Sequence, residues 1–356
     1  MIVEPLSDEQ EWERFVASSP QGTFYHTLRW KRVLEKSFAF EPLYLVIRDS
    51  NRDLLGVCPF VIRKELKVIK VLDSLWESDY AGPLVKDGYA EPAMSALMDY
   101  LKQLAHKKGI TYAKIRFSDE ELSQHFSYTH SRTETLTGVM ALDLGQKPTD
   151  YIWGKVFTTK GEQRTYIRRF EKDGFQNREA ESIEDLNTFY TLYRNNMSYI
   201  GGLSFPFSFF KQAWDALYPD YFNILLTAND EKCIGAEAFF IYKPNRSICQ
   251  TCIGLDRNVP TRYHTYIYLS WGLIKWAEKN GYRYVSLGST PSDPSDVHYS
   301  HKAKFGAEFD QDYVVYLPFN RTAFLVREMM ENLWRKTRTR LPKQVARKLE
   351  DTAEGQ

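Results

Sequence analysis

A pattern of helix, glycine and strand occurs once in each half of this 356-residue chain and constrains its fold more than any other feature. Residues 97–118 and 269–290 align without a gap, and both contain a glycine, Gly109 or Gly281, at the matching place. Apolar residues before each glycine recur at three- and four-residue spacing, which predicts an amphipathic helix with a glycine C-cap. Apolar and polar residues alternate after each glycine, which predicts a strand. We therefore expect the same helix–strand unit twice.

Each unit follows a pair of predicted antiparallel strands. Residues 43–48 and 54–63 flank a polar turn in the first half, and residues 222–228 and 232–243 flank another in the second. Helices, antiparallel strands, a long helix and a further strand thus follow one another twice, which predicts an α+β fold duplicated in tandem. We place the first domain at residues 1–147, the second at 148–319 and a basic amphipathic tail at 320–356, because the predicted strand 139–144 gives way to a turn.

The composition fits two domains and excludes several classes of protein. Hydrophobic residues make up 43% of the chain, which is enough for two cores at this length. The 47 basic and 46 acidic residues leave a net charge of +1, so no global charge draws the chain to nucleic acid or acidic lipid. The N-terminus lacks a signal segment, and no stretch approaches the about 20 apolar residues of a spanning helix. We expect a cytoplasmic protein.

Neither candidate metal motif in the sequence is complete. Cys249 and Cys252 match CxxC within a predicted strand, where residues three apart point to opposite faces. His298 and His301 follow two aspartates, but no third histidine or cysteine stands at ligand spacing. The four cysteines are too scattered for a disulfide framework. We expect no metal site and no disulfide.

Six segments resemble, in order, the Fem peptidyltransferases (FemA, FemB and FemX) and their wider group of GNAT-like acyltransferases. The segments are 22–34, where a tryptophan opens a helix; 55–60, with Gly-Val-Cys-Pro; 78–84, a glycine-containing loop; 160–175, a basic helix closing on a glycine; 286–290; and 301–307, His-Lys-Ala-Lys-Phe-Gly-Ala. The resemblance covers essentially the whole chain and implies a tandem GNAT fold with mixed central sheets flanked by helices. The long helical arm of the staphylococcal members has no counterpart, since residues 182–221 have room only for two ordinary helices.

The resemblance implies transfer of an acyl or aminoacyl group to an amine of a cell-envelope precursor, either peptidoglycan-like or a polysaccharide. The partner is then a nucleotide- or lipid-linked precursor, and the donor is a cosubstrate, aminoacyl-tRNA or acyl-CoA, with no permanently bound cofactor. One alternative is a CoA-dependent N-acyltransferase that acts on an amino sugar of an exopolysaccharide. A second is a binding scaffold without catalysis, motivated by an arginine where the family has a lysine.

Three residues are candidates for catalysis through the resemblance. Lys302 matches the lysine of the family's Phe-Lys-x-x-Phe-Gly element and is expected to stabilise negative charge on the donor or leaving group. Arg32 falls on the position of the lysine implicated in catalysis in FemX, but a guanidinium cannot act as a general base. Asp119 stands one residue from a position where Fem members tend to be acidic, and it equally reads as a helix start.

Further residues are candidates for binding. For the acceptor they are Trp30, Lys31, His26, Asp79, Tyr80 and the basic face of the predicted helix 160–172, which presents Arg164, Arg168, Arg169 and Lys172. For the donor they are Arg257, Arg262, Tyr263, His264 and Lys304, in a chain that lacks the glycine-rich phosphate loop before its second long helix. A tryptophan on an apolar helix face and a basic helix each also read as ordinary core and ordinary surface.

We expect one groove between the domains, lined by Trp30, Arg32, Arg164, Arg168 and Lys302. In the tail, residues 324–334 are expected to pack their apolar side chains on the domain. Basic side chains outnumber apolar ones in residues 335–348, which leaves a peripheral contact with an anionic membrane face open.

Overall fold

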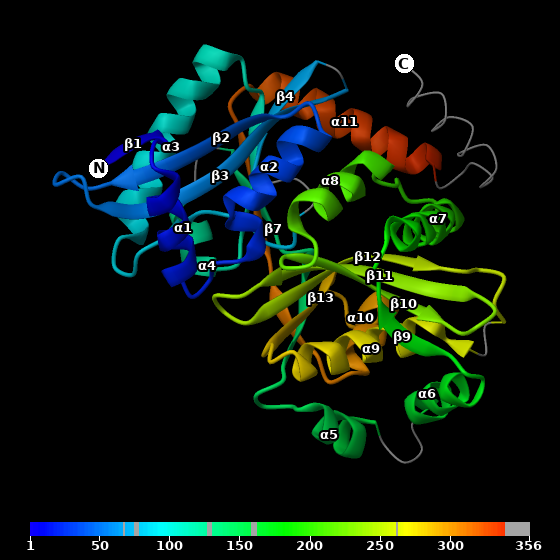
Figure 1. Ribbon diagram of the computed structural model, residues 1–356. Helices are drawn as coiled ribbons and strands as arrows, with labels where there is room; N and C mark the ends of the chain where they lie inside the picture. Colours follow the sequence, from blue (N-terminus) through cyan, green and yellow to red (C-terminus); the bar gives the residue numbers. More distant parts are fainter. Residues whose placement is uncertain (67, 75–77, 127–129, 158–161, 261–262, 339–356) are drawn as a thin grey trace.

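The computed structural model describes residues 1–66, 68–74, 78–126, 130–157, 162–260 and 263–338, and it contains two mixed β-sheets flanked by helices (Figure 1). In spatial order, the first sheet contains β1 (Ile2–Pro5), β2 (Glu41–Arg48), β3 (Leu54–Glu65), β4 (Ile69–Asp73), β6 (Tyr112–Phe117), β15 (Tyr313–Pro318) and β7 (Arg132–Glu134), with β5 (Leu84–Val85) beside β3. The second contains β14 (Glu308–Gln311), β8 (Thr137–Asp143), β13 (Tyr284–Pro291), β12 (Ser247–Leu255), β11 (Cys233–Tyr242), β10 (Phe222–Ala228) and β9 (Gln176–Glu179). The expected α+β class is confirmed.

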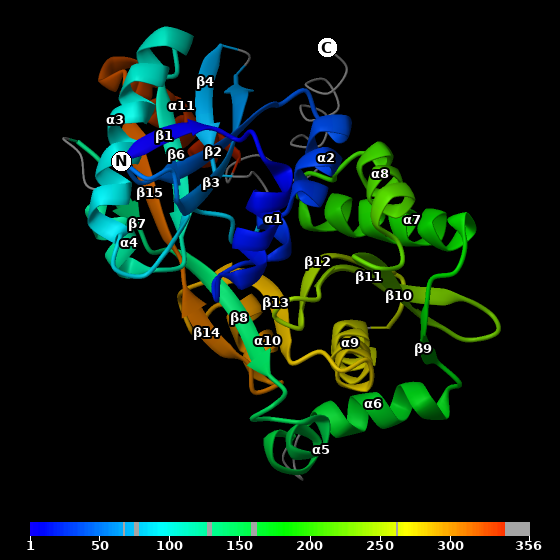
Figure 2. The ribbon, with the colours of Figure 1, turned by 60° about the vertical axis from the view of Figure 1, so that its left-hand side comes forward.

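The helices connect and cover these sheets. Those of the first half are α1 (Glu9–Ser18), η1 (Phe24–His26), α2 (Leu28–Ser37), α3 (Ala90–Lys108) and α4 (Glu120–His125). Those that follow are α5 (Thr149–Tyr151), η2 (Ile152–Val156), α6 (Glu162–Lys172), α7 (Ile183–Ile200), α8 (Phe207–Leu217), α9 (Thr265–Lys279), α10 (Val297–Ala303) and α11 (Arg321–Arg338). Figure 2 shows α9 between the second sheet and the α5–α6 segment. Among the described residues, no helix is both long and apolar enough to cross a membrane.

The duplicated unit predicted from the sequence is present in both halves. The helix α3 ends at Gly109, which has the left-handed φ of 66° that a glycine C-cap permits, and β6 follows. The helix α9 is followed by Gly281, also at positive φ, and by β13. Both predicted hairpins form, as β2–β3 and β10–β11, and α7 and α8 are the two ordinary helices expected in place of an arm.

The two sheets exchange one strand each, so the expected boundary at residue 147 does not separate them. The strand β8 precedes that boundary but pairs with β13 in the second sheet. The strand β15 comes from the end of the chain but pairs with β6 and β7 in the first sheet. Each exchanged strand lies next to the last strand of a duplicated unit, so the two sheets are built alike and each is completed by the other half of the chain.

One hydrophobic cluster joins the two halves. It contains Trp12, Phe24 and Trp30 from the first half and Phe209 and Phe240 from the second, all buried. The rings of Phe24 and Phe240 stack with centroids 4.6 Å apart, and the ring of Trp30 meets that of Phe240 edge-on at 5.1 Å. Aromatic pairs contribute about 1 kcal/mol each beyond their buried area. The halves are therefore packed as one body.

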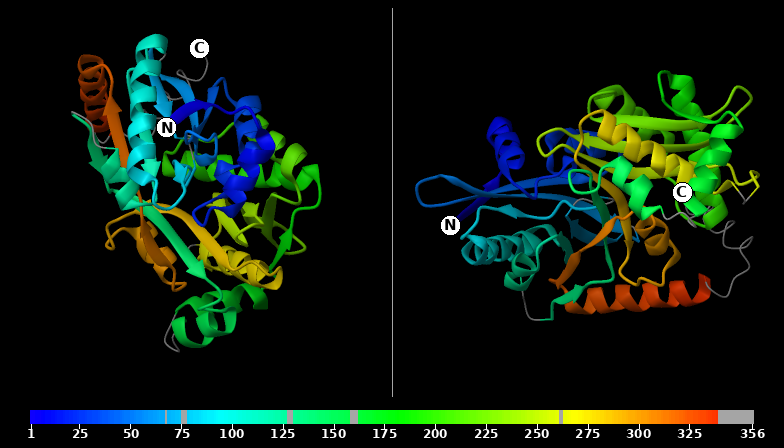
Figure 3. Two further views of the ribbon diagram at one scale, coloured as in Figure 1. Left: turned by 90° about the vertical axis from the view of Figure 1, so that its left-hand side faces the viewer. Right: turned by 90° about the horizontal axis from the view of Figure 1, so that it is seen from below.

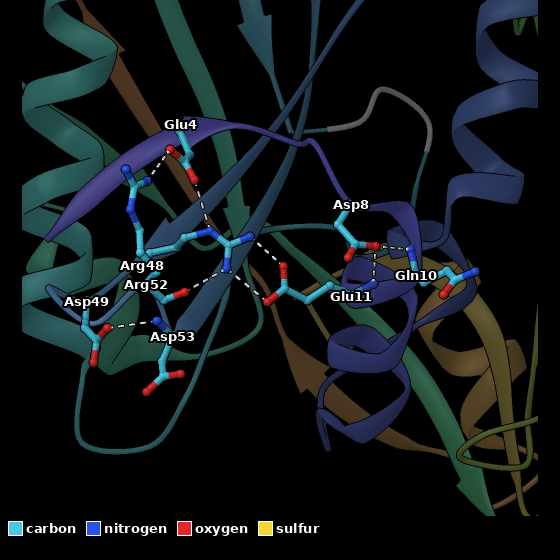
Figure 4. A network of polar contacts seen from close by, with 8 residues as sticks. All are labelled: Glu4, Asp8, Gln10, Glu11, Arg48, Asp49, Arg52 and Asp53. Carbon is cyan, nitrogen blue, oxygen red and sulfur yellow. Dashed lines mark hydrogen bonds and ion pairs between the residues drawn. The ribbon is translucent and has the colours of Figure 1, made fainter.

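A buried arginine fastens the N-terminal segment to the first sheet (Figure 4). Arg48 on β2 donates to Glu4 of β1 at 3.0 Å and to both carboxylate oxygens of Glu11 on α1, at 3.0 and 2.5 Å. Its side chain is only 10% exposed, and the pKa of the Glu11 carboxyl is lowered, chiefly by the hydrogen bond from Arg48. Trp12, one residue further along α1, donates from Nε1 to the carbonyl of His26 at 2.8 Å, next to the candidate site.

The strand exchange makes a specific prediction about stability. Leu317 on β15 is fully buried in the first sheet's core, opposite Ala113 of β6. Leu317→Ala should lower the free energy of unfolding by about 3 kcal/mol, through lost burial and the cavity it leaves. Hydrogen exchange should accelerate at residues 112–117, about two hundred positions earlier in the chain.

Leu136→Ala makes the same chemical change at a side chain that is 65% exposed, and it should cost no more than about 0.5 kcal/mol. Faster exchange confined to the second sheet in Leu317→Ala would contradict the strand assignment.

Candidate functional site

A cavity of about 690 Å³ lies between the two halves. Its wall includes Arg63, Asp73, Ser74, Ser78, Asp79, Lys114 and Arg116 from the first half and Asn196, Gln250, Thr251, Arg257, Tyr266, Gly288, Ser289, His298, His301 and Lys302 from the second. The volume is that of a small-molecule site, and most of the polar side chains named are cationic or neutral.

The cavity lies where two pairs of parallel strands end. In the first sheet, β4 and β6 pair in parallel over only three residues, up to Asp73 and Lys114. In the second sheet, β12 and β13 also pair over three residues, up to Cys249 and Ser286. The residues that follow these pairs line the cavity. Crevices beyond the carboxyl ends of parallel strands are common ligand sites, because the chain turns away there and leaves backbone groups exposed.

A bulge in each strand of the second pair marks the place where the strands part. The register of β12 against β11 shifts so that Thr251 is the extra residue, and the register of β13 against β8 shifts between Ser286 and Ser289. Gly288, within the second bulge, has φ of 78°, which favours glycine. Cys249 and Cys252 were expected to point to opposite faces of this strand, and that expectation is wrong. The bulge in β12 lies between them, and both cysteines pack in the cluster that joins the halves.

Lys302 reaches the cavity from α10 and is 9% exposed, so it is not a surface lysine. Its Nζ donates to the carbonyls of Gly288 at 2.8 Å and Ser289 at 2.7 Å, both in the β13 bulge. Burial lowers the pKa of Lys302 to about 8, and the nearby Asp79 carboxyl opposes that shift. The lysine is therefore fixed in position and exchanges its proton near neutral pH.

Asp79 lies across the same end of the cavity, on the loop between β4 and β5. Its Oδ2 accepts a hydrogen bond from Ser286 at 3.2 Å. Burial raises the pKa of the Asp79 carboxyl, while Lys302 and Arg116 act in the opposite direction. The structure thus brings together Asp79 and Lys302, which the sequence analysis assigned to the acceptor and to catalysis.

His26 holds the loop that carries Asp79 instead of lining the cavity. Its ring is fully buried, and burial lowers its pKa to about 4, so the imidazole is neutral. Because the backbone N–H of Thr23 donates to Nδ1, the proton is on Nε2, which donates to the carbonyl of Gly82 at 3.0 Å. Gly82 approaches the Arg116 carbonyl so closely that a Cβ would lie 1.9 Å from it. Tyr80 is likewise buried in the core.

Arg116, which the sequence analysis missed, ties the first half's wall together. It donates to the carbonyls of Ser78 at 2.6 Å and Asp79 at 3.0 Å, and its Nε lies 3.7 Å from Asp312. Burial raises the pKa of the Asp312 carboxyl to about 6. An arginine in an alternating strand is usually an outward-facing residue, so the sequence offered no signal for Arg116 beyond its place near the strand's end.

Arg257, one of the expected donor-binding residues, also lines the cavity. Its Nε donates to Oδ1 of the buried Asn196 at 2.7 Å, and its guanidinium lies 4.8 Å from the ring centroid of Tyr199. Asn196 in turn donates to the carbonyl of Ile253 on β12. The guanidinium is thereby oriented at the cavity wall, and its remaining N–H groups suit an anionic ligand.

A second buried acid lies behind the cavity wall. Glu237 on β11 is fully buried, burial raises its pKa to about 8, and its Oε1 has no hydrogen-bond partner among the residues that the structure describes. Its Oε2 accepts from the side-chain amide of Gln250, which lines the cavity and also lies 3.4 Å from Ser270. The contact fixes the orientation of the Gln250 amide. This pair was not predictable from the sequence, because a lone glutamate within an apolar strand does not reveal its partner.

Three of the expected residues near the N-terminus do not reach the cavity. Trp30 is 1% exposed and packs in the cluster that joins the halves. Arg32 is 56% exposed and pairs with Glu9 at 2.6 Å, and Lys31 pairs with Glu35. The helix α2 turns its apolar face inward, and this leaves both cations outside.

Asp119 also has a local structural role. It is the N-cap of α4, where its Oδ1 accepts from the backbone N–H of Leu122 at 3.1 Å. Such a contact satisfies a free helix amide, and the side chain is outside the cavity wall. The helix-start reading of Asp119 holds.

The basic face of α6 lies away from the cavity. Arg164 and Arg168 are stacked over the ring of Trp153, 5.5 and 5.8 Å from its centroid, and Arg164 donates to the Trp153 carbonyl. Arg169 and Lys172 are on the same helix, and none of these four lines the cavity. Of the five residues expected to line one groove, only Lys302 does so.

The remaining donor candidates that the structure describes are placed apart from the cavity. Tyr263 donates to Asp173 at 2.5 Å, and the ring of His264 packs on Tyr166 at 4.0 Å. Lys304 ends α10 outside the cavity wall, and Arg262 lies outside the described residues. Within the described part of the chain, no group of three or more histidine, cysteine or acidic side chains is arranged to hold a metal ion.

No protein-family model matches the sequence, and no curated protein matches it either. Solved structures do share the fold. FemX matches with a TM-score of 0.70 and 14% identity over 92% of this chain and 99% of FemX. The C-terminal domain of a putative lysylphosphatidylglycerol synthetase from Agrobacterium fabrum matches with a TM-score of 0.56 and 12% identity, covering 86% of this chain and 91% of that one.

A tandem GNAT protein from the clavulanic acid biosynthesis pathway matches with a TM-score of 0.58 and 12% identity, over 88% of this chain and 97% of that one. All three matches run through both halves. The two sheets, the exchange of strands between them and these matches agree, and the chain has the tandem GNAT-type fold that FemX also has.

Proposed function

We propose that this protein transfers an acyl or aminoacyl group to an amine of an anionic cell-envelope precursor, and that the transfer takes place in the cavity between the two halves. The observation that carries the proposal is the buried Lys302, whose ammonium is held by two carbonyls of a strand bulge beside the carboxyl of Asp79. An ion held rigidly in a partly dry cavity is suited to stabilise charge that develops during a reaction.

The chemistry needs no covalent intermediate. The amine nitrogen attacks the carbonyl carbon of the donor's ester or thioester, a C–N bond forms, and the C–O or C–S bond to the leaving group breaks. We assign to Lys302 the stabilisation of negative charge on the carbonyl oxygen or the leaving group. We assign to Asp79 the acceptance of the amine's proton, since its raised pKa brings a carboxylate closer to the operating range of a general base.

The charge of the cavity supports an anionic acceptor. Its wall contains the cations Arg63, Lys114, Arg116 and Arg257 besides Lys302, against the acids Asp73 and Asp79. Arg63 pairs with Asp73, and Arg116 lies beside Asp312, so Lys114 and Arg257 are the cations best placed to meet a phosphate of a nucleotide- or lipid-linked precursor. The names of two structures with this fold, FemX and a putative lysylphosphatidylglycerol synthetase, agree with chemistry at the envelope.

A CoA-dependent acyltransferase that acts on an amino sugar is the alternative, and a tandem GNAT protein among the matches gives it support. Thermal-shift measurements with acetyl-CoA, aminoacyl-tRNA and UDP-linked muramyl peptides separate the two, because a ligand that binds only the folded chain raises the melting temperature. Product formation from the stabilising pair then tests the transfer itself. Stabilisation by such ligands without product under any pairing would favour the binding scaffold instead.

Lys302→Ala should reduce turnover by about 10²–10³-fold, which is the usual cost of removing one preorganised electrostatic donor. Lys302→Arg should recover part of that loss, since the guanidinium keeps the charge but is too broad for the same point. Arg32→Ala is the matched comparison, because Arg32 is exposed on α2 and outside the cavity, and it should keep wild-type turnover. Full activity of Lys302→Ala, with an unchanged melting temperature, would refute the assignment.

The lowered pKa of Lys302 predicts how turnover depends on pH. In its proposed role the Lys302 side chain acts as an ammonium, so kcat should fall as pH rises through about 8, the folded-state pKa, because the ammonium loses its proton there. An arginine at this position stays protonated, so Lys302→Arg should lose that falling limb while working at a lower plateau. The measurement is kcat against pH for both proteins, and a falling limb that persists unchanged in Lys302→Arg would assign it to another group.

A further inference from the structure

The C-terminal helix α11 exposes a row of large apolar side chains. Leu325, Val326, Met329, Met330 and Leu333 are between 47% and 65% exposed. At 3.6 residues per turn they fall within an arc of about 140° on one face. We expected residues 324–334 to pack their apolar side chains inward; only Phe324, from the opposite face, packs on the first sheet, and these five residues face outward.

The inner face of α11 is fastened to the first sheet, which fixes the direction of the apolar face. Phe324 packs against Tyr112 of β6, and Arg327 donates to Glu65 of β3 at 3.1 Å. Glu328 pairs with Arg132 of β7 at 2.7 Å. Figure 3 shows α11 along the outer edge of the molecule in both views. The apolar face therefore belongs to a helix whose opposite side is packed against the first sheet.

The charge of this segment is unlike that of the rest of the chain. Between residues 321 and 348 the sequence has nine lysines and arginines and two acids, in a protein whose net charge is +1. Both acids are neutralised toward the inner side, Glu328 by Arg132 and Glu331 by Arg327. An apolar face within a strongly basic segment is the composition of helices that lie in the interface of an anionic bilayer.

A neighbouring turn also exposes apolar side chains. Glu65, which binds Arg327 of α11, ends β3, and the turn that follows exposes Leu66 by 57% and Val68 by 79%. The sequence around that turn is also basic, with Lys64, Lys67 and Lys70. Two adjacent elements thus combine exposed apolar side chains with lysine and arginine.

We propose that the outer face of α11, together with the β3–β4 turn, docks this protein on the surface of an anionic phospholipid bilayer. The excess of lysine and arginine in residues 321–348 argues against a second copy of this chain, whose segment carries the same sign, and for a lipid surface of opposite sign. The docking surface is also close to the cavity, because Glu65 pairs both with Arg327 and with Arg63, which lines the cavity wall. For the proposed function, this places a bilayer beside the site that would receive a lipid-linked acceptor.

The test is sedimentation of the full chain with vesicles of phosphatidylcholine, with and without phosphatidylglycerol. Wild type should pellet with the phosphatidylglycerol vesicles, less so at high salt, and should stay in solution with phosphatidylcholine alone. The triple variant Leu325→Ser, Met329→Ser, Leu333→Ser should bind at least about tenfold more weakly, since it loses the apolar part of the contact. Ile2→Ser, Tyr89→Ser, Tyr151→Ser is the matched control, because these side chains are 41–46% exposed elsewhere, and it should pellet like wild type.

Three results would overturn the proposal. The first is equal pelleting of the α11 triple variant and wild type while both keep their melting temperature. The second is a wild-type dimer in analytical ultracentrifugation that the triple variant abolishes, which would assign the face to a second copy. The third is pelleting only after removal of residues 339–356, which would assign the face to the chain's own C-terminal segment. Vesicle binding does not depend on turnover, so it is decided separately from the transfer reaction.

Discussion

The exchange of β8 and β15 between the sheets is the constraint on which the rest of the structure depends. In the first sheet, β6 lies between its parallel partner β4 and the exchanged strand β15. In the second sheet, β13 lies between its parallel partner β12 and the exchanged strand β8. Neither half can complete its sheet alone, so the two units are held in one relative arrangement. That arrangement brings the carboxyl ends of both parallel pairs to one place, and the cavity forms there.

Within the cavity, the decisive chemistry comes from charge placed where water is scarce. Burial lowers the pKa of Lys302 to about 8, and the Asp79 carboxyl opposes that shift. Two carbonyls accept hydrogen bonds from the ammonium and hold it in place. The Gly288 bulge turns those carbonyls toward the lysine, which a regular strand would direct into the sheet. His26, although distant from any ligand, supports the same geometry, since its neutral ring anchors the loop that carries Asp79.

The sequence predicted the features that local pattern controls. Apolar periodicity and Gly109 and Gly281 located the duplicated helices, and alternation located the strands. The pairing of those strands could not be predicted, because the alternation of apolar and polar residues in β8 and β15 is compatible with either sheet. The expected boundary near residue 147 rested only on the order of elements along the chain. The resemblance of short sequence segments to the Fem family then identified Lys302 and the loop of Asp79, whose neighbours in space come from distant segments.

The errors at the site have a shared physical origin. Trp30, Arg32 and the α6 arginines were chosen for residue type, but helix orientation decides which face meets the cavity, and α2 and α6 turn their basic faces outward. Arg116 and the Glu237–Gln250 pair were missed for the converse reason. They are polar residues within strands, and a single sequence does not distinguish a buried polar residue from one at an exposed strand face until its neighbours are known.

In the proposed reaction, donor and acceptor meet in the cavity at the ends of the two parallel pairs. This can be tested by hydrogen–deuterium exchange of the full chain, with and without whichever of acetyl-CoA, aminoacyl-tRNA or a UDP-linked muramyl peptide raises its melting temperature. We expect slower exchange at residues 114–116, 250–255 and 287–291 when ligand is bound. Protection confined to α6 and its surroundings, with no change at those strand ends, would contradict it.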